Sequence, residues 1–179
     1  MNYKIIIILL FTSLITSCVQ ERDLSQNTVI AHILSQPDGL HPYNNNSVMR
    51  SYVFQYTQKT LLRLDLETLE YVPDLLKELP SSSEDNKTFY FELKDNINWD
   101  DGTQLTAEDI IFSTKIMLCH LTNNSQIRPI YNSVIHSVEA DPNNPLKFSM
   151  RAQDIKWTAK TIMGGIYTVS YTHLRAHET

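Results

Sequence analysis

Apolar and polar residues alternate in several short stretches of this chain, which is the pattern of half-buried β-strands. In one of them Phe89, Phe91 and Leu93 share a face, with Tyr90 and Glu92 between them. The predicted strands are residues 28–35, 61–66, 88–93, 134–140 and 146–150. The last two strands are separated only by Asp-Pro-Asn-Asn-Pro, so we expect them to form a hairpin.

Apolar residues spaced three or four positions apart predict a helix over residues 48–60. The residues expected on its buried side are Val48, Tyr52, Val53 and Tyr56. A second, shorter helix is predicted to start at residues 72–76, because Pro73 occupies an early position that suits the first turn of a helix.

A third helix is predicted after Thr106, where a hydroxyl can cap the helix and Asp109 supplies an acid three positions later. Asp101-Gly102 indicates a tight turn just before it. The residues expected along one side of this helix are Ile110, Thr114, Met117, Leu118 and Leu121. Successive predicted strands are joined by hairpins, whereas an all-parallel sheet would need a crossover helix between them. We therefore predict an α/β protein of the mixed α+β kind.

The N-terminus has the features of an export signal. Lys4 precedes an apolar run at residues 5–11, which is too short to span a bilayer, since that takes about 20 residues. The run leads to Ile15-Thr16-Ser17-Cys18, which resembles the lipobox of bacterial lipoproteins. We therefore expect a signal peptide at residues 1–17, lipidation at Cys18 and a tether at residues 18–27. An ordinary signal peptide with an incidental cysteine is the alternative.

Lipidation of Cys18 would leave Cys119 as the one thiol of the mature chain, so no disulfide could form within it. We expect Cys119 to act as a small buried apolar residue. A catalytic or metal-binding role for Cys119 with His120 has no support, because no second pair of ligands has suitable spacing.

The C-terminal residues 169–179 resemble the translation of a sequencing-library adapter. We therefore expect natural sequence to stop near residue 168, so that residues 28–168 are an incomplete domain. His173 and His177, with Glu178 beside them, have the spacing of helical metal ligands. We assign them no metal, because they lie in the adapter-like tail.

Charge and motifs exclude several classes of function. The chain carries 15 Lys and Arg residues against 20 Asp and Glu residues, and this net charge of −5 without a basic cluster argues against nucleic-acid binding. No phosphate-binding loop and no nucleophile motif of a hydrolase appears in the sequence. The acids at positions 100, 101, 108 and 109 are interpreted as turn and cap residues, and not as an acid–base pair. We predict no catalytic residue, no metal and no cofactor.

Residues 99–113, Trp-Asp-Asp-Gly-Thr-Gln-Leu-Thr-Ala-Glu-Asp-Ile-Ile-Phe-Ser, closely resemble the signature of family 5 extracellular solute-binding proteins. These are the peptide- and nickel-binding components of ABC transporters. Leu40-His41-Pro42 resembles the family's Leu-Asp-Pro, with histidine in place of the usual acid. Further resemblances in the family's order lie at residues 72–75, 88–93 and 138–141.

The resemblance implies a periplasmic-binding-protein type II fold, a two-lobed clamp of which only the N-terminal part is present. It implies a monomeric, non-enzymatic protein that captures dipeptides or oligopeptides and delivers them to ABC permease subunits. The protein would be lipid-anchored in the bacterial cell envelope, on the periplasmic or outer surface. In this family the loop after the first strand reaches the ligand, so Gln36, Asp38 and His41 become the candidate ligand contacts. For each of them a solvated turn residue is the alternative.

Other functions stay open at this point. The same fold could serve a surface lipoprotein in adhesion or peptide signalling, and an envelope hydrolase is a weaker possibility. Nothing in the sequence selects peptide over nickel or sugar except the prevalence of peptide binders in the family. We also expect the polypeptide as written to bind peptide poorly and to aggregate, because an incomplete lobe exposes apolar faces and strand edges.

Overall fold

The computed structural model describes residues 32–37, 39–41, 43, 47–122 and 125–169. The chain divides into two units, residues 1–32 and 33–179, and the description below concerns the second. Of the first predicted strand, residues 28–31 lie outside the described part, and residues 32–35 form no strand. Within the described residues no helix is both long and apolar enough to cross a membrane.

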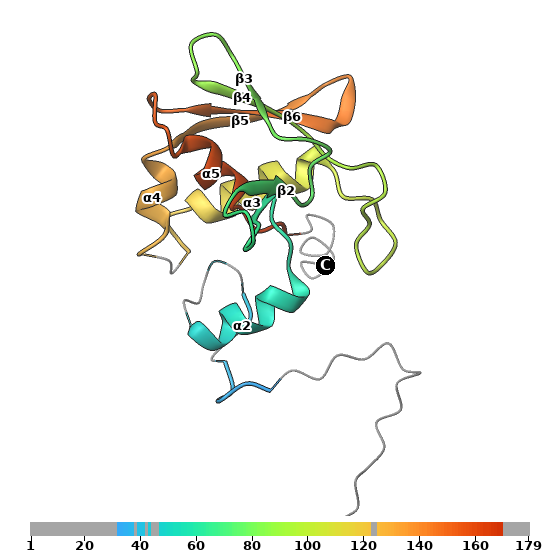
Figure 1. Ribbon diagram of the computed structural model, residues 1–179, viewed down its shortest axis with the longest axis vertical. Coiled ribbons are helices and arrows are strands. Elements are labelled where there is room, and N and C mark those ends of the chain that lie inside the picture. Colours follow the sequence, from blue (N-terminus) through green and yellow to red (C-terminus); the bar gives the residue numbers. More distant parts are fainter. Residues whose placement is uncertain (1–31, 38, 42, 44–46, 123–124, 170–179) are drawn as a thin grey trace, which may run out of the picture. The chain divides into compact units, whose positions relative to one another are not determined.

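The main sheet has four antiparallel strands in the order β3-β4-β6-β5 (Figure 1). Its strands are β3 (Ser81–Ser82), β4 (Thr88–Glu92), β5 (Ile135–Asp141) and β6 (Asn144–Ala152). The predicted hairpin is confirmed, since β5 and β6 pair directly and Asp141 lies opposite Asn144. The predicted strand at residues 88–93 is confirmed as β4, which pairs with β6.

One face of the main sheet forms the core. Phe91 of β4 lies opposite Phe148 of β6, and their rings stack with centroids 4.9 Å apart and an angle of 3° between the planes. Phe89 and Met150 form the next pair and are also buried. Helix α3 (Ala107–Leu118) covers this face, where it packs against β5 and β6 (Figure 1).

Local signals position α3 as predicted. Gly102 has φ = +85°, a conformation that favours glycine, and the Thr103 amide donates to Asp101 Oδ1 over 2.9 Å. Thr106 and Asp109 then form a capping box, in which the Thr106 amide donates to Asp109 Oδ2 over 3.0 Å. The helix ends at Leu118, so the prediction that Leu121 lies on its buried side is wrong; that residue is 80% exposed.

A second sheet of two strands forms where a helix start was predicted at residues 72–76. Strand β1 (Leu62–Leu64) pairs antiparallel with β2 (Tyr71–Pro73), so the predicted helix start at residues 72–76 is wrong. The Asp65 carboxylate accepts hydrogen bonds from the amides of Glu67 and Thr68, at 2.9 and 3.1 Å, and thereby closes the connection between the strands. Once the chain has turned back, pairing with β1 decides the conformation of Pro73.

Helix α2 (Val48–Thr57) forms where it was predicted but buries a different side. Its buried residues are Arg50 and Phe54, whereas Val48, Tyr52 and Tyr56 are exposed. The guanidinium of Arg50 lies over the Phe54 ring, 5.1 Å from its centroid, and donates to the carbonyl oxygen of His41 over 3.4 Å. Periodicity alone missed this side because a buried arginine reads as a polar position.

Two short helices were not predicted, α4 (Arg128–Asn132) and α5 (Ala159–Gly164). Helix α5 packs against β1, and Gly164 makes this approach possible: a Cβ atom there would lie only 2.5 Å from Leu62 Cδ1. Together with Met163 and Ile166, both fully buried, α5 joins the two sheets into one core.

Candidate functional site

The predicted ligand loop is described in part. Cys18 and Asp38 lie outside the described residues, so the structure places neither of them. Gln36 is exposed, and His41 is half-buried. The loop therefore offers Gln36 to solvent, while His41 faces the protein.

The surroundings of His41 favour its neutral form. Its Nδ1 accepts a hydrogen bond from the Tyr43 amide over 3.1 Å, and its carbonyl oxygen accepts from Arg50. Burial, and secondly the positive charge of Arg50, lower the pKa of His41 below its usual value. A neutral imidazole suits hydrogen bonding to a ligand better than charge pairing with one.

Tyr43 connects the predicted ligand loop to residues near the C-terminal end of the described chain. Its hydroxyl donates to the carbonyl oxygen of Tyr167, and the side chain is 3% exposed. Burial raises the pKa of Tyr43, so the hydroxyl keeps its proton and remains a donor. Beside it, Tyr131 donates to the carbonyl oxygen of Gly165 over 3.3 Å. Burial raises the pKa of Tyr131 to about 12.

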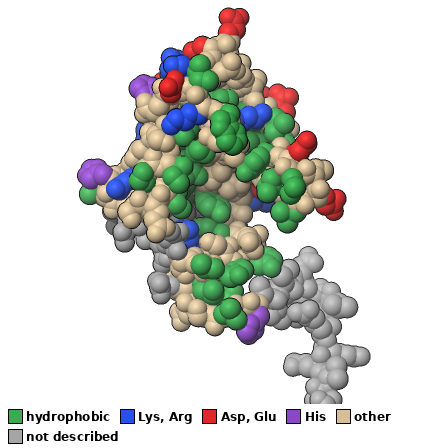
Figure 2. All heavy atoms as spheres, turned by 60° about the vertical axis from the view of Figure 1, so that its left-hand side comes forward, with side chains coloured by type: hydrophobic (Ala, Val, Ile, Leu, Met, Phe, Trp, Pro, Cys, Tyr) green, Lys and Arg blue, Asp and Glu red, His purple; other side chains and the backbone are tan. Residues whose placement is uncertain are grey.

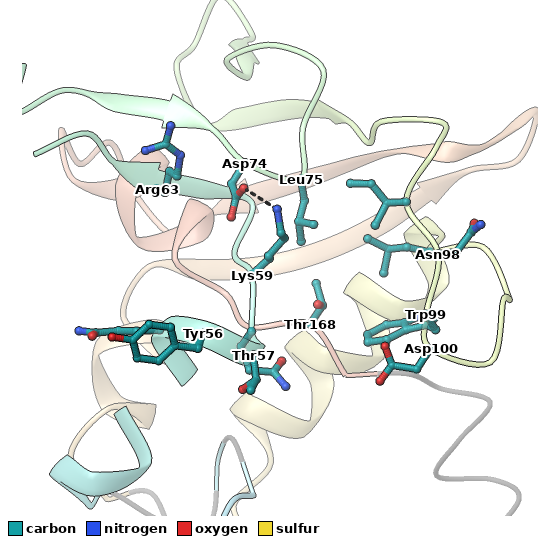
Figure 3. A pocket seen from close by; sticks show the side chains of 14 residues that line it. Tyr56, Thr57, Lys59, Arg63, Asp74, Leu75, Asn98, Trp99, Asp100 and Thr168 are labelled. Atoms are coloured by element: carbon teal, nitrogen blue, oxygen red, sulfur yellow. Dashed lines mark hydrogen bonds and ion pairs between the residues drawn. The ribbon is translucent and has the colours of Figure 1, made fainter. Parts of the chain in front are cut away.

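A groove of about 610 Å³ lies elsewhere on this unit (Figure 3). Its lining comes from separate parts of the chain: residues 55–59 at the end of α2, Arg63 of β1, residues 74–75 just after β2, the segment before α3, and Thr168. Neither Gln36 nor His41 lines it. The groove was missed by sequence reasoning because no single stretch contains its residues.

The groove contains an ion pair between two of its walls. Lys59 Nζ lies 3.4 Å from Asp74 Oδ1, and the side chain of Asp74 is 17% exposed against 66% for that of Lys59. Figure 3 shows this pair in the middle of the groove, with Arg63 to one side and Asp100 to the other. Among the residues that the structure describes, neither Arg63 nor Asp100 lies within ion-pair distance of an opposite charge.

Trp99 forms part of the groove's wall and is held firmly in place. Its indole Nε1 donates to Asp109 Oδ2 over 3.4 Å, and its amide donates to the Thr103 carbonyl oxygen over 2.8 Å. The Trp99 ring packs against the core and also borders the groove. The interpretation of Asp101 and Asp109 as turn and cap residues is confirmed.

This arrangement can hold a polar ligand. The groove's volume lies within the range of small-molecule sites, about 300–1,000 Å³. It combines charges of both signs with the aromatic side chains of Tyr56 and Trp99. Within the described ranges, no group of three or more His, Cys, Asp or Glu side chains is arranged to hold a metal ion.

Comparisons with known proteins found one similar curated sequence and several similar solved structures. Protein XP55 of Streptomyces lividans is 27% identical over 139 residues, which cover 76% of this chain and 24% of that protein. The peptide-binding pheromone receptor PrgZ superposes with a TM-score of 0.70 at 17% identity, over 79% of this chain and 30% of that one. The periplasmic oligopeptide-binding protein OppAIV of Borrelia burgdorferi gives a TM-score of 0.66 at 22% identity, over 80% and 31%.

This chain therefore spans about a quarter to a third of the length of these proteins. Its fold is part of the type II periplasmic-binding-protein fold, as the signature at residues 99–113 implied. Residues 70–173, more than half of the chain, match the family model described as bacterial extracellular solute-binding proteins, family 5 Middle. The chain belongs to this family of bacterial extracellular solute-binding proteins.

Proposed function

We propose that this chain is the N-terminal part of a substrate-binding lipoprotein of an ABC transporter, which captures dipeptides or oligopeptides for a membrane permease. The observation that carries the proposal is the family match over residues 70–173. Solved relatives that bind peptides, PrgZ and the Borrelia protein, support peptide as the ligand class. In this function the protein performs no chemistry on the ligand, because capture and release are driven by closure of two lobes.

In this proposal the loop at residues 35–43 contacts the ligand through Gln36, Asp38 and His41. An ionised Asp38 would pair with the amino terminus of a peptide, which is a charge-assisted hydrogen bond. A neutral His41 and the amide of Gln36 would donate to or accept from the peptide main chain. Such main-chain contacts suit a binder that accepts many side chains.

Cys18 would carry the lipid anchor, with residues 18–27 as its tether and residues 1–17 removed. This places the mature protein on the envelope surface, periplasmic or external. Replacement of Cys18 by alanine should abolish incorporation of labelled fatty acid and release the protein from membranes. Incorporation that persists in this variant would contradict the assignment of the anchor.

We also propose that natural sequence ends near residue 168 and that residues 169–179 are derived from an adapter. The described end of the chain is well packed: Thr168 is buried, and the Val169 amide donates to Ser113 Oγ over 2.7 Å. The family match itself extends to residue 173. Re-sequencing the source DNA across codons 150 to 180 decides the matter. A reading frame that continues differently after codon 168 supports the proposal, and confirmation of the printed tail contradicts it.

The chain as printed should aggregate when expressed alone. Several large apolar side chains are exposed, among them Leu66 at 82% and Trp157 at 94%. Figure 2 shows hydrophobic side chains gathered over α2 and the neighbouring surface. In light scattering we expect large particles at micromolar concentration, and a monodisperse monomer would contradict this expectation.

Peptide binding is best tested on the protein encoded by the complete reading frame. Isothermal titration calorimetry with short peptides should show saturable binding, weakened about 10-fold or more by Asp38→Asn. The matched control is Glu84→Gln, which removes an exposed carboxylate of the β3–β4 connection. If both variants bind peptide with equal affinity, Asp38 does not contact the ligand. If the protein binds no peptide at all, peptide is not the ligand class.

A second function is favoured by one comparison. PrgZ is a pheromone receptor, so the same fold serves peptide signalling in that protein. A signalling lipoprotein would bind one peptide sequence tightly and unrelated peptides weakly. A transport protein would bind many sequences with similar affinity, so the calorimetry on a peptide panel separates the two functions.

A further inference from the structure

The loop between β6 and α5 exposes two large apolar side chains that have no role in the proposed function. Trp157 is 94% exposed and Ile155 is 63% exposed, and only Lys156 stands between them in the chain. A single exposed apolar residue is ordinary, but tryptophan has one of the largest apolar side chains and is usually covered over most of its surface. Two such residues in one short loop therefore indicate a contact surface.

Hydrogen bonds hold the backbone that carries this pair. Asp154 Oδ1 accepts from the Ile155 amide over 2.8 Å at the start of the loop. In its middle, Lys156 Nζ donates to the carbonyl oxygen of Ser133 over 2.6 Å, which fixes the loop to the end of α4. Ile155 and Trp157 are thus presented to solvent on a backbone that its neighbours hold. Less conformational entropy is lost when a partner contacts side chains on such a preformed loop.

The surroundings of the loop are basic, although the chain as a whole carries a net charge of −5. Residues 151–168 contain three basic residues and one acid, Asp154, and Oδ1 of that acid lies 3.6 Å from Lys87 Nζ. Residues 110–138, which include all of α4, contain two basic residues and no acid. Helices α4 and α5 lie side by side (Figure 1). Because charges further away than about 8 Å are screened at physiological salt, this local excess of positive charge decides what the loop attracts.

An exposed tryptophan among basic residues matches a lipid surface. Tryptophan is enriched where proteins meet the boundary between lipid and water, since its ring is mostly apolar while its N–H is polar. Each lysine or arginine near an anionic bilayer adds about 1 kcal/mol of attraction. The exposed Leu66 offers a contrast, because Asp65 and Glu67 flank it and an anionic surface would repel them. Charge therefore favours the β6–α5 loop as the part that meets a membrane.

We propose that the β6–α5 loop is a membrane-contact site, which inserts Ile155 and Trp157 into the interface of an anionic lipid bilayer. Lys156 uses one N–H on Ser133 and keeps two further donors for lipid phosphates. Lys160, in the first turn of α5, supplies a second positive charge. The proposal rests on the lipid anchor of the proposed function, which keeps the loop close to a bilayer, and it does not depend on the transported ligand.

Co-sedimentation with vesicles tests the site on the protein encoded by the complete reading frame, produced from residue 19 onward and therefore without lipid. Vesicles of equal parts phosphatidylglycerol and phosphatidylcholine should bind it, and vesicles of phosphatidylcholine alone should bind it roughly 10-fold more weakly. Trp157→Ala should lower the partition coefficient about 10-fold, and Lys160→Gln about 5-fold. Trp157→Phe, which keeps an aromatic ring, should lose less than Trp157→Ala.

Leu66→Ala and Arg63→Gln are the matched controls, since they remove an exposed apolar and an exposed basic side chain from the β1–β2 hairpin. Both should bind the anionic vesicles as the unchanged protein does. Equal losses in the controls, equal binding to both kinds of vesicle, or binding to neither overturns the proposal.

Acrylamide quenching shows whether Trp157 is free in the complete protein. The emission that Trp157→Phe removes should be quenched readily without vesicles and protected when anionic vesicles are added. Protection without vesicles would mean that the rest of the chain covers Trp157, and would overturn the proposal. Peptide calorimetry and labelling with fatty acid report on the proposed function separately, so failure of vesicle binding leaves that function standing.

Discussion

Removal of the Asp109 carboxylate tests whether the turn and the first turn of α3 act as one unit. Asp109 is 5% exposed, and its Oδ2 accepts from the amide and the hydroxyl of Thr106, at 3.0 and 3.3 Å, and from the Trp99 indole. Loss of the hydrogen bond from the Thr106 amide, the Asp109 half of the capping box, costs about 1 kcal/mol, and a buried donor left without its charged acceptor costs roughly a further 1–2 kcal/mol. Asp109→Ala should therefore destabilise this region by about 2–3 kcal/mol.

Hydrogen exchange measures this cost where it arises. A local destabilisation of about 2.8 kcal/mol raises the population of the open state roughly 100-fold, since each 1.4 kcal/mol is tenfold. Mass spectrometry of peptides that cover residues 99–118 should show exchange faster by about that factor in Asp109→Ala. The matched control is Glu108→Ala, which removes the exposed acid of the same helical turn. That control should cost less than about 1 kcal/mol, through the helix dipole alone.

Equal acceleration of hydrogen exchange in the Asp109 and Glu108 variants would refute the reasoning. It would mean that the buried carboxylate stabilises the helix only through the helix dipole, as an exposed acid does. Acceleration confined to α3, with the amides at Trp99 and Thr103 unchanged, would also refute it. The turn and the helix would then open independently, and Trp99 would not be a fixed wall of the groove.

Two further predictions follow from packing and from charge. Gly164→Ala should destabilise the protein by about 1–3 kcal/mol in urea denaturation, because the new Cβ would overlap Leu62. Gly165→Ala is the control and should change stability by less than about 1 kcal/mol, since its Cβ would have no neighbour closer than 3.5 Å. Similar losses of stability in both variants would contradict the packing of α5 on β1. The pKa of His41 is lowered in the folded protein by burial and by Arg50, so the unfolded chain binds the proton more readily. Stability should therefore fall as the pH drops below about 6.5, the unperturbed value for histidine, and His41→Gln should flatten that dependence; an unchanged pH profile in the variant would contradict it.

The elements that could be predicted from the sequence are those fixed by residues close together in the chain. Asp101-Gly102 and the capping pair Thr106 and Asp109 act within a few residues of each other, so the turn and the start of α3 could be predicted. The β5–β6 hairpin followed from alternation on both sides of a short connection. These are local interactions, and they need no knowledge of the rest of the fold.

Features that depend on distant contacts could not be predicted. Strand β2 was taken for a helix start because its conformation is set by pairing with β1 and not by Pro73 itself. The buried side of α2 was missed because Arg50 is stabilised there by the Phe54 ring and the His41 carbonyl. The groove escaped notice for the same reason, since Lys59 and Asp74 meet only after the chain has folded.

The central claim, capture of peptide for transport, is tested most directly by peptide uptake in cells that carry or lack the gene. Deletion should strongly reduce uptake of a radiolabelled peptide mixture, and the complete gene with Cys18 intact should restore it. Uptake that is unchanged by deletion would contradict the transport function. If a response to one peptide were lost in those same cells, the protein would be a receptor that uses this fold for signalling.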